Sequence, residues 1–234
     1  MKMDFRWLRM VFCAVGISGT ALAQAKPGHL DEVIRQLDAS SAKFQSAEAD
    51  FRWDLYERVV KQTSTQAGTI YFTRKGESTQ MGAQIVPPGA KTLEFKDGKL
   101  RVFDPTSNHL IEIAAGKNSA QYESFLTLGF GGSGTGLSKV WTITDLGAES
   151  MSDGSQTVSV EKLDLVAKEQ SVRNMFTHIV IWVDPARDVS LKQQFFTPSE
   201  DVRTAVYTKL RYNTKVDTKP FAIKMDKQTT VDRR

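Results

Sequence analysis

The chain has 234 residues, a formal net charge of +4 and one cysteine, and this length is enough for a single domain with a sizeable core. Its lysines and arginines are scattered and form no basic stripe, so we expect no nucleic-acid partner. The only cysteine, Cys13, lies near the N-terminus, which excludes disulfides and thiolate metal sites from the rest of the chain.

Residues 1–23 have the pattern of a secretory signal peptide. Lys2, Arg6 and Arg9 precede the apolar stretch MVFCAVGISGTALA, which ends in a small-residue cleavage motif at Ala23. The apolar stretch is too short for a membrane span. We therefore expect export to the periplasm and a mature single domain formed by residues 24–234.

The mature chain begins with one helix and one long strand. Apolar residues recur at helical spacing over 29–44, which predicts an amphipathic helix that covers another element. The period then changes to two over 47–60, which predicts a strand with one apolar and one charged face. The residues of the apolar face are Ala47, Ala49, Phe51, Trp53 and Leu55.

Short strands dominate the rest of the sequence, each bounded by Gly, Pro, Asp or Ser. The predicted strands outside the hairpin at 93–105 cover residues 69–74, 78–86, 108–115, 139–150, 156–167, 176–185, 189–198 and 202–214. Short connections between neighbours indicate antiparallel pairing. A run of about 10 to 11 strands favours a curved sheet or a barrel.

The stretch LEFKDGKLRVFDP, residues 93–105, carries the strongest local signal. Two alternating runs flank Asp97-Gly98, a pair that accepts positive φ at both positions and so predicts a two-residue hairpin turn. We expect this turn to fix the register of two central strands.

Residues 118–138 interrupt the strand pattern. Tyr122, Phe125, Leu126 and Leu128 have helical spacing, and a glycine-rich joint and a short apolar turn around Leu137 follow. An inserted helix-loop segment in a strand-rich chain is expected to cap an opening, as a lid.

No catalytic or metal-binding motif is evident. His29, His109 and His178 are far apart in sequence, and no GxSxG motif is present. GFGGSG at 129–134 matches GxGxxG, but no strand is predicted before it and no long helix after it, as dinucleotide binding requires. We expect no enzymatic activity, no cofactor and no metal.

One segment resembles a known family. Gly68 begins a G-x-(aromatic/apolar)-R pattern that ends at Arg74, and Asp97-Gly98-Lys99 and Asp104-Pro105 follow it. These residues resemble the periplasmic lipoprotein carrier family of the LolA type. The resemblance implies an incomplete antiparallel barrel, covered by an N-terminal helix and a helical lid, that encloses a hydrophobic cavity.

The same resemblance implies the function and its partners. A family member is a monomer that carries lipoproteins by their acyl chains from an inner-membrane lipoprotein-releasing ABC transporter to an outer-membrane acceptor. Arg74 has the place of the arginine that holds the lid by hydrogen bonds. The residues expected to form the acyl cavity and lid are Phe51, Trp53, Leu55, Phe72, Arg74, Leu93, Phe95, Phe125, Leu126, Leu128, Phe130, Leu137, Trp141 and Ile181.

Three alternatives stay open at this point. The aromatic and aliphatic residues on the strands could be ordinary core packed against helices. The same fold could serve a regulatory protein that senses lipid or lipoprotein. An exported enzyme with a dispersed polar site would instead have a pocket lined by clustered polar residues with perturbed pKa values.

Overall fold

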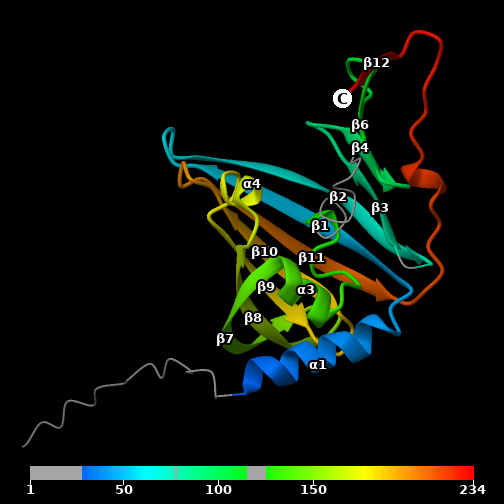
Figure 1. The fold of residues 1–234 in the computed structure, drawn as a ribbon. Coiled ribbons are helices and arrows are strands. Elements are labelled where there is room, and N and C mark those ends of the chain that lie inside the picture. Colours follow the sequence, from blue (N-terminus) through cyan, green and yellow to red (C-terminus); the bar gives the residue numbers. More distant parts are fainter. Residues whose placement is uncertain (1–27, 77, 115–124) are drawn as a thin grey trace, which may run out of the picture.

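The computed structural model describes residues 28–76, 78–114 and 125–234 (Figure 1). The predicted signal peptide and Tyr122 lie outside the described residues. The elements, in chain order, are α1 (His29–Ser41), β1 (Ser46–Glu57), β2 (Gln62–Lys75), β3 (Ser78–Ile85), β4 (Lys91–Lys96), β5 (Lys99–Asp104), β6 (His109–Ala114), α3 (Gly134–Val140), β7 (Trp141–Ser152), β8 (Thr157–Ala167), α4 (Gln170–Arg173), β9 (His178–Asp184), β10 (Val189–Phe196), β11 (Val202–Tyr212), η2 (Lys219–Phe221) and β12 (Thr230–Arg233).

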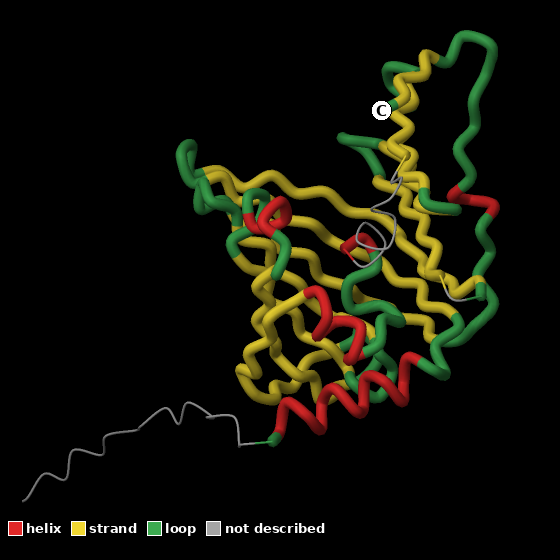
Figure 2. The backbone as a smooth tube through the Cα atoms, in the orientation of Figure 1, coloured by secondary structure: helices red, strands yellow, loops and turns green. Residues whose placement is uncertain are grey.

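All twelve of these strands belong to one open sheet. Their order is β12-β6-β5-β4-β3-β2-β1-β11-β10-β9-β8-β7, so β12 and β7 are its two free edges and the barrel does not close. Neighbouring strands are antiparallel except for β12, which runs parallel to β6. Figure 2 shows the sheet wrapping around the helices and loops that cover it. The predicted incomplete antiparallel barrel is confirmed. The sheet has more strands than expected, because β12 is too short to show an alternating pattern.

Strand β1 lies in the middle of the sheet and joins two halves. One side of β1 pairs with β2, the next strand in the chain, and the other side pairs with β11, the last long strand. The predicted alternation holds in the middle of β1, where Phe51 is buried while Arg52 is exposed, but not at its start, where residues 46–49 are all buried. Strand β2 begins seven residues before the predicted strand at 69–74. This early part is polar, so its pairing with β1 leaves no apolar pattern in the sequence.

Helix α1 covers one end of the sheet together with α3 (Figure 1). It ends at Ser41, three residues before the predicted end at 44. Val33 and Leu37 are buried against residues of β7, β8 and β9, and burial of such side chains contributes about 1.5–3 kcal/mol each. Asp38 accepts hydrogen bonds from the backbone N–H of Thr135 at 2.9 Å and from its hydroxyl at 2.6 Å. The start of α3 is thereby fixed to α1.

The predicted hairpin is present. Asp97 has φ 51° and Gly98 has φ 71°, and Lys96 pairs with Lys99 across the turn. Positive φ at both central residues matches the right-handed twist of the two strands. The strands it joins, β4 and β5, lie near the β12 edge of the sheet and not at its centre as expected.

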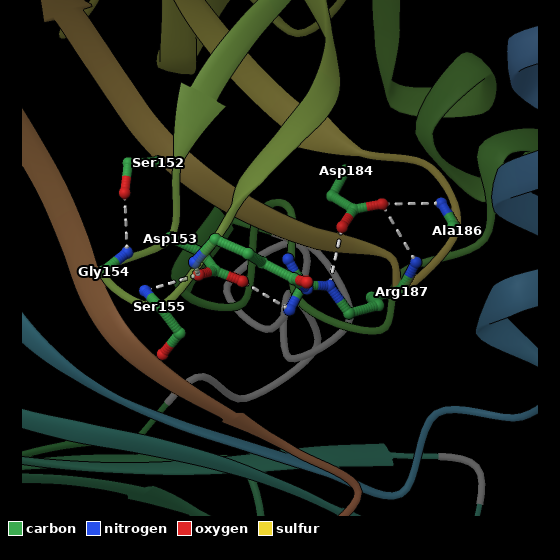
Figure 3. A network of polar contacts seen from close by, with 8 residues as sticks. Ser152, Asp153, Gly154, Ser155, Asp184, Ala186 and Arg187 are labelled. Atoms are coloured by element: carbon green, nitrogen blue, oxygen red, sulfur yellow. Dashed lines mark hydrogen bonds and ion pairs between the residues drawn. The ribbon is translucent and has the colours of Figure 1, made fainter.

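A buried polar network joins the β7–β8 turn to the β9–β10 turn (Figure 3). The Arg187 guanidinium donates to Asp184 at 2.6 Å and to Asp153 at 2.9 Å. Asp153 also accepts from the N–H of Ser155, and Asp184 from the N–H of Ala186. Because both carboxylates are almost fully buried, this network fixes the turn at 184–188 from which β10 begins.

Candidate functional site

The concave face of the sheet is crossed by residues 125–133, which we name the cover segment. Its residue Phe130 forms an isolated antiparallel bridge with Val189 at the start of β10. The Ser190 N–H donates to the Gly129 carbonyl at 2.7 Å, and the Gly131 N–H donates to the Asp188 carbonyl at 3.1 Å. The cover segment is thus attached to β10 by backbone hydrogen bonds.

A second attachment comes from the opposite side. The Arg74 guanidinium, at the end of β2, donates to the Gly131 carbonyl, as the resemblance led us to expect. The Ser41 hydroxyl donates to the same carbonyl at 2.9 Å. The Arg74 guanidinium also lies 5.8 Å from the centre of the Phe44 ring. One carbonyl of the cover segment is therefore bound by both α1 and β2.

The third attachment is a buried glutamine that the sequence did not reveal. Gln193 on β10 is 4% exposed and donates to the Leu128 carbonyl at 2.5 Å. Its side-chain oxygen accepts from the Tyr207 hydroxyl at 3.1 Å. A glutamine on the same face of β10 as Phe195 is the signal that could have identified it, because buried amides need partners.

An apolar cavity of about 220 Å³ lies between the cover segment and strands of the sheet. Seven predicted residues line it, namely Trp53, Phe72, Leu93, Phe125, Leu126, Leu128 and Phe130. The prediction omitted Ile70, Met81, Phe176, Gln193, Phe195, Arg203, Ala205 and Tyr207, which also line it. The Phe72 and Phe130 rings stack with their centres 4.0 Å apart, so the cover segment packs directly on the sheet.

A second cavity, of about 440 Å³, lies on the other side of the cover segment, toward α1 and α3. Arg74, Leu137 and Ile181 from the predicted set line this cavity. Leu128 lines both cavities. The cover segment is therefore a partition between two spaces that would join if it moved.

The remaining predicted residues have other places. Phe51 and Phe95 are buried in the core under the cover segment, and Trp141 is buried in the core under α1. Leu55 lines a third, smaller cavity of about 160 Å³ together with Trp53. Leu137 belongs to the seven-residue helix α3, where a short turn was expected. The alternation of apolar and polar residues predicts which strand residues point inward. It does not predict whether an inward side chain lines a cavity or packs in the core.

One buried carboxyl group lies beside the partition. Asp188 is 2% exposed, and its Oδ2 has no hydrogen-bond partner within the described part of the chain. Burial raises the pKa of Asp188 well above its usual value, the positive charge of Arg74 opposes that rise, and the carboxylate of Asp38 adds to it. The site thus places a weakly acidic group close to the arginine that holds the cover segment.

Among the described residues, one group has the composition of a metal site. His29, Asp145 and Glu161 present ligand atoms that all lie within 4.8 Å of one another. They come from the start of α1, from β7 and from β8, away from both cavities. Sequence reasoning treated His29 as isolated because its neighbours in space are more than 100 residues away.

These features define a class of protein: an open β-barrel with an apolar cavity beneath a covering segment. Solved structures with TM-scores of 0.50 or more share this fold. A conserved protein from Thermus thermophilus matches with a TM-score of 0.53 and 10% identity over 87% of this chain and 98% of its own. The Pseudomonas aeruginosa MucA/MucB complex matches with a TM-score of 0.50 and 9% identity, over 83% of this chain and 61% of that chain. A LolA superfamily protein from Nitrosomonas europaea matches with a TM-score of 0.39 and 13% identity, over 83% and 97%.

At the level of sequence, no protein-family model and no curated protein matches the chain. Within the part of the chain that the structure describes, no helix has the length and apolar character needed to cross a membrane.

Proposed function

We propose that the protein is a periplasmic carrier that holds the acyl chains of lipoproteins in its apolar cavity and shuttles them from the inner to the outer membrane. In this role it performs no chemical reaction. It receives cargo from an inner-membrane ABC transporter and delivers it to an outer-membrane acceptor. Burial of apolar surface supplies the affinity, at about 25 cal/mol per Å².

The observation that carries this proposal is the apolar cavity beneath the cover segment. Its lining is dominated by aromatic and aliphatic side chains, and polar atoms come from Gln193, Arg203, the Tyr207 hydroxyl and the Trp53 indole N–H. Acyl chains form no hydrogen bonds, so such a lining favours them over polar ligands. The lining also has few groups suited to catalysis, which argues against the enzyme alternative.

Cavity size supports a mobile cover. At about 220 Å³ the cavity is smaller than the ~300–1,000 Å³ of ordinary ligand pockets. Displacement of the cover segment would join this cavity to the larger one beside α1, because Leu128 separates them. In the proposed function, loading of cargo requires the cover segment to leave β10.

Mass spectrometry of the protein purified from its native periplasm tests the proposal, and co-purified lipoproteins or acyl species are the expected result. A cavity-filling variant, Ala205→Phe, should lose binding of a fluorescent acyl probe by at least about tenfold. The matched control is Val206→Phe, since the next residue on β11 faces the other side of the sheet. Leu126→Trp serves as a second filling variant. Equal probe binding by the filled and control variants would contradict the proposal.

The likeness to MucB favours one second candidate, a sensor on the same fold. That protein was solved in complex with MucA. A carrier must release its cargo, so a fluorescent acylated peptide should move from the protein to acceptor vesicles that contain an outer-membrane acceptor. Stable binding without any transfer would favour the sensor.

A further inference from the structure

The first turn of α1 meets β7 and β8 through an arrangement that the proposed carrier function does not use. His29 Nδ1 lies 2.6 Å from Asp145 Oδ2. Because a carboxylate only accepts hydrogen bonds, Nδ1 carries the proton and donates it. In the neutral imidazole the other ring nitrogen, Nε2, has a free lone pair, and it lies 3.8 Å from Glu161 Oε1.

Glu161 is an acidic residue on an apolar face. It has the same phase on β8 as Leu163 and Leu165, which are fully buried, and it is itself only 8% exposed. Its Oε2 is buried and has no hydrogen-bond partner among the residues that the structure describes. A buried carboxylate oxygen without a hydrogen bond is costly, so a native structure holds one where a ligand or a counter-charge compensates.

The local backbone brings the two carboxylates together. The pairing of β7 with β8 shifts register between Asp145 and Ala148, and the Gly147 N–H donates to Asp145 Oδ1 at 2.8 Å. Asp145 is the last residue before this bulge and pairs with Leu163, so it lies on the face that also carries Glu161. Nearby Glu32 is bound to Arg35 and Gln36 and adds only negative charge.

We propose that His29 Nε2 and Glu161 bind a divalent transition-metal cation of the Zn²⁺ class, with Asp145 as the residue that orients the imidazole. Bonds from Zn²⁺ to nitrogen and oxygen are each about 2.1 Å. The 3.8 Å between Nε2 and Oε1 therefore accommodates an ion with a bent N–metal–O angle. The unpartnered Oε2 supplies a further donor, and water completes the shell on the partly exposed side of His29.

Asp145 has the outer role because its distance to the ring is too short for an ion. A carboxylate that accepts from the far N–H of a metal-bound histidine fixes its tautomer and increases its basicity. Imidazole with carboxylate suits Zn²⁺ and its neighbours in the first transition row, while Ca²⁺ and Mg²⁺ prefer all-oxygen sites. The bound ion would fasten the start of α1 to β7 and β8.

A second histidine–aspartate pair provides a matched control. His178 Nδ1 lies 2.6 Å from Asp164 Oδ1, and His178 has a similar exposed fraction to His29. In the described residues this pair has no third carboxylate within ligand distance. A Zn²⁺ site that depends on Glu161 therefore distinguishes the two histidines.

The experiment is a Zn²⁺ titration of the tag-free, chelator-treated protein in competition with a chromophoric chelator. We expect one ion per chain, an affinity lowered at least ~10-fold by Glu161→Gln or His29→Gln, and one lowered ~10–100-fold by Asp145→Asn. His178→Gln should bind as the wild type does. Zn²⁺ should raise the melting temperature of the wild type but not of Glu161→Gln, and metal-free melting curves establish that each variant folds. Equal affinity of Glu161→Gln and wild type, or an equal loss in His178→Gln, would overturn the proposal.

Discussion

Arg74 on β2 donates to the carbonyl of Gly131, 57 residues further along the chain, and so ties the sheet to the cover segment. The contact is charge-assisted, and the Ser41 hydroxyl supports it at the same oxygen. Under the proposed function, this hydrogen bond stabilises the closed form. Loading has to break it, and release of cargo restores it.

Arg74→Leu should leave the protein folded but shift it toward the open form. Ser41 still donates to Gly131, so the variant does not leave that carbonyl unpaired. Loss of a charged hydrogen bond of about 1.5–3 kcal/mol should increase retention of a fluorescent acyl probe roughly tenfold or more. Arg52→Leu removes an exposed arginine paired with Asp54 and is the control. Identical affinity and release in the two variants would leave Arg74 without a special role.

Gly98→Val should destabilise the fold by more than about 1 kcal/mol, because a β-branched residue fits poorly at φ 71°. Urea unfolding measured by circular dichroism gives the change in the free energy of unfolding. Gly132→Val is the matched control, since Gly132 lacks a positive φ and has open space where a Cβ would be added. The prediction fails if both substitutions cost the same.

Gly129→Ala should detach the cover segment from β10. A Cβ at Gly129 would lie 2.0 Å from the Ser190 hydroxyl and 3.0 Å from its Cβ, and the residue has φ 73°. Hydrogen exchange at the Gly131 and Ser190 amides, which donate between the cover segment and β10, should accelerate by about tenfold, a local loss of ~1.4 kcal/mol. In the wild type these amides should already exchange faster than those of β1. Gly132→Ala, whose Cβ would meet no atom of the described residues within 4 Å, should leave the rates unchanged.

Asp188→Asn should stabilise the protein more at pH 7 than at pH 4. The pKa of Asp188 is raised in the folded state by burial, so the folded protein holds its proton at pH values where the unfolded chain has lost it. The protonated Asp188 therefore contributes its full stabilisation of the folded state at pH values below the unfolded pKa of about 3.9. This stabilisation falls by ~1.4 kcal/mol for each pH unit as the pH rises from there to the folded pKa.

Asparagine does not ionise, and it tolerates the φ of 54° at this position. Chemical denaturation across pH 4 to 7 measures the difference between the variant and the wild type. Asp50→Asn removes a carboxylate that pairs with Lys209 and should give no such gain. A difference between Asp188→Asn and wild type that stays constant with pH would refute the argument.

The alternating strands and the hairpin at Asp97-Gly98 could be predicted because their signals are local. The inward face of β1 follows from period two, and the turn follows from two residues that accept positive φ. β12 could not be predicted in this way, since a four-residue strand owes its existence to the β6 edge that it pairs with.

The site was predictable only in part. Phe130 and Leu128 could be identified as covering residues, because apolar side chains in a glycine-rich insertion need a surface to pack on. Gln193 and Asp188 owe their roles to contacts with the cover segment, which is remote from them in the sequence. Whether an inward aromatic lines a space, as Trp53 does, or fills one, as Phe51 does, depends on neighbours that are remote in sequence.

The pairing of β1 with β11 also has a consequence for how the chain folds. Glu48 and Arg211, which form an ion pair across this seam, are 163 residues apart in the sequence. A chain that emerges N-terminus first therefore completes β1 through β6 while one side of β1 remains an unpaired edge. Such long-range pairing is slow, and an unpaired edge is prone to join other chains. The early half of the nascent protein thus needs protection from aggregation until β11 arrives.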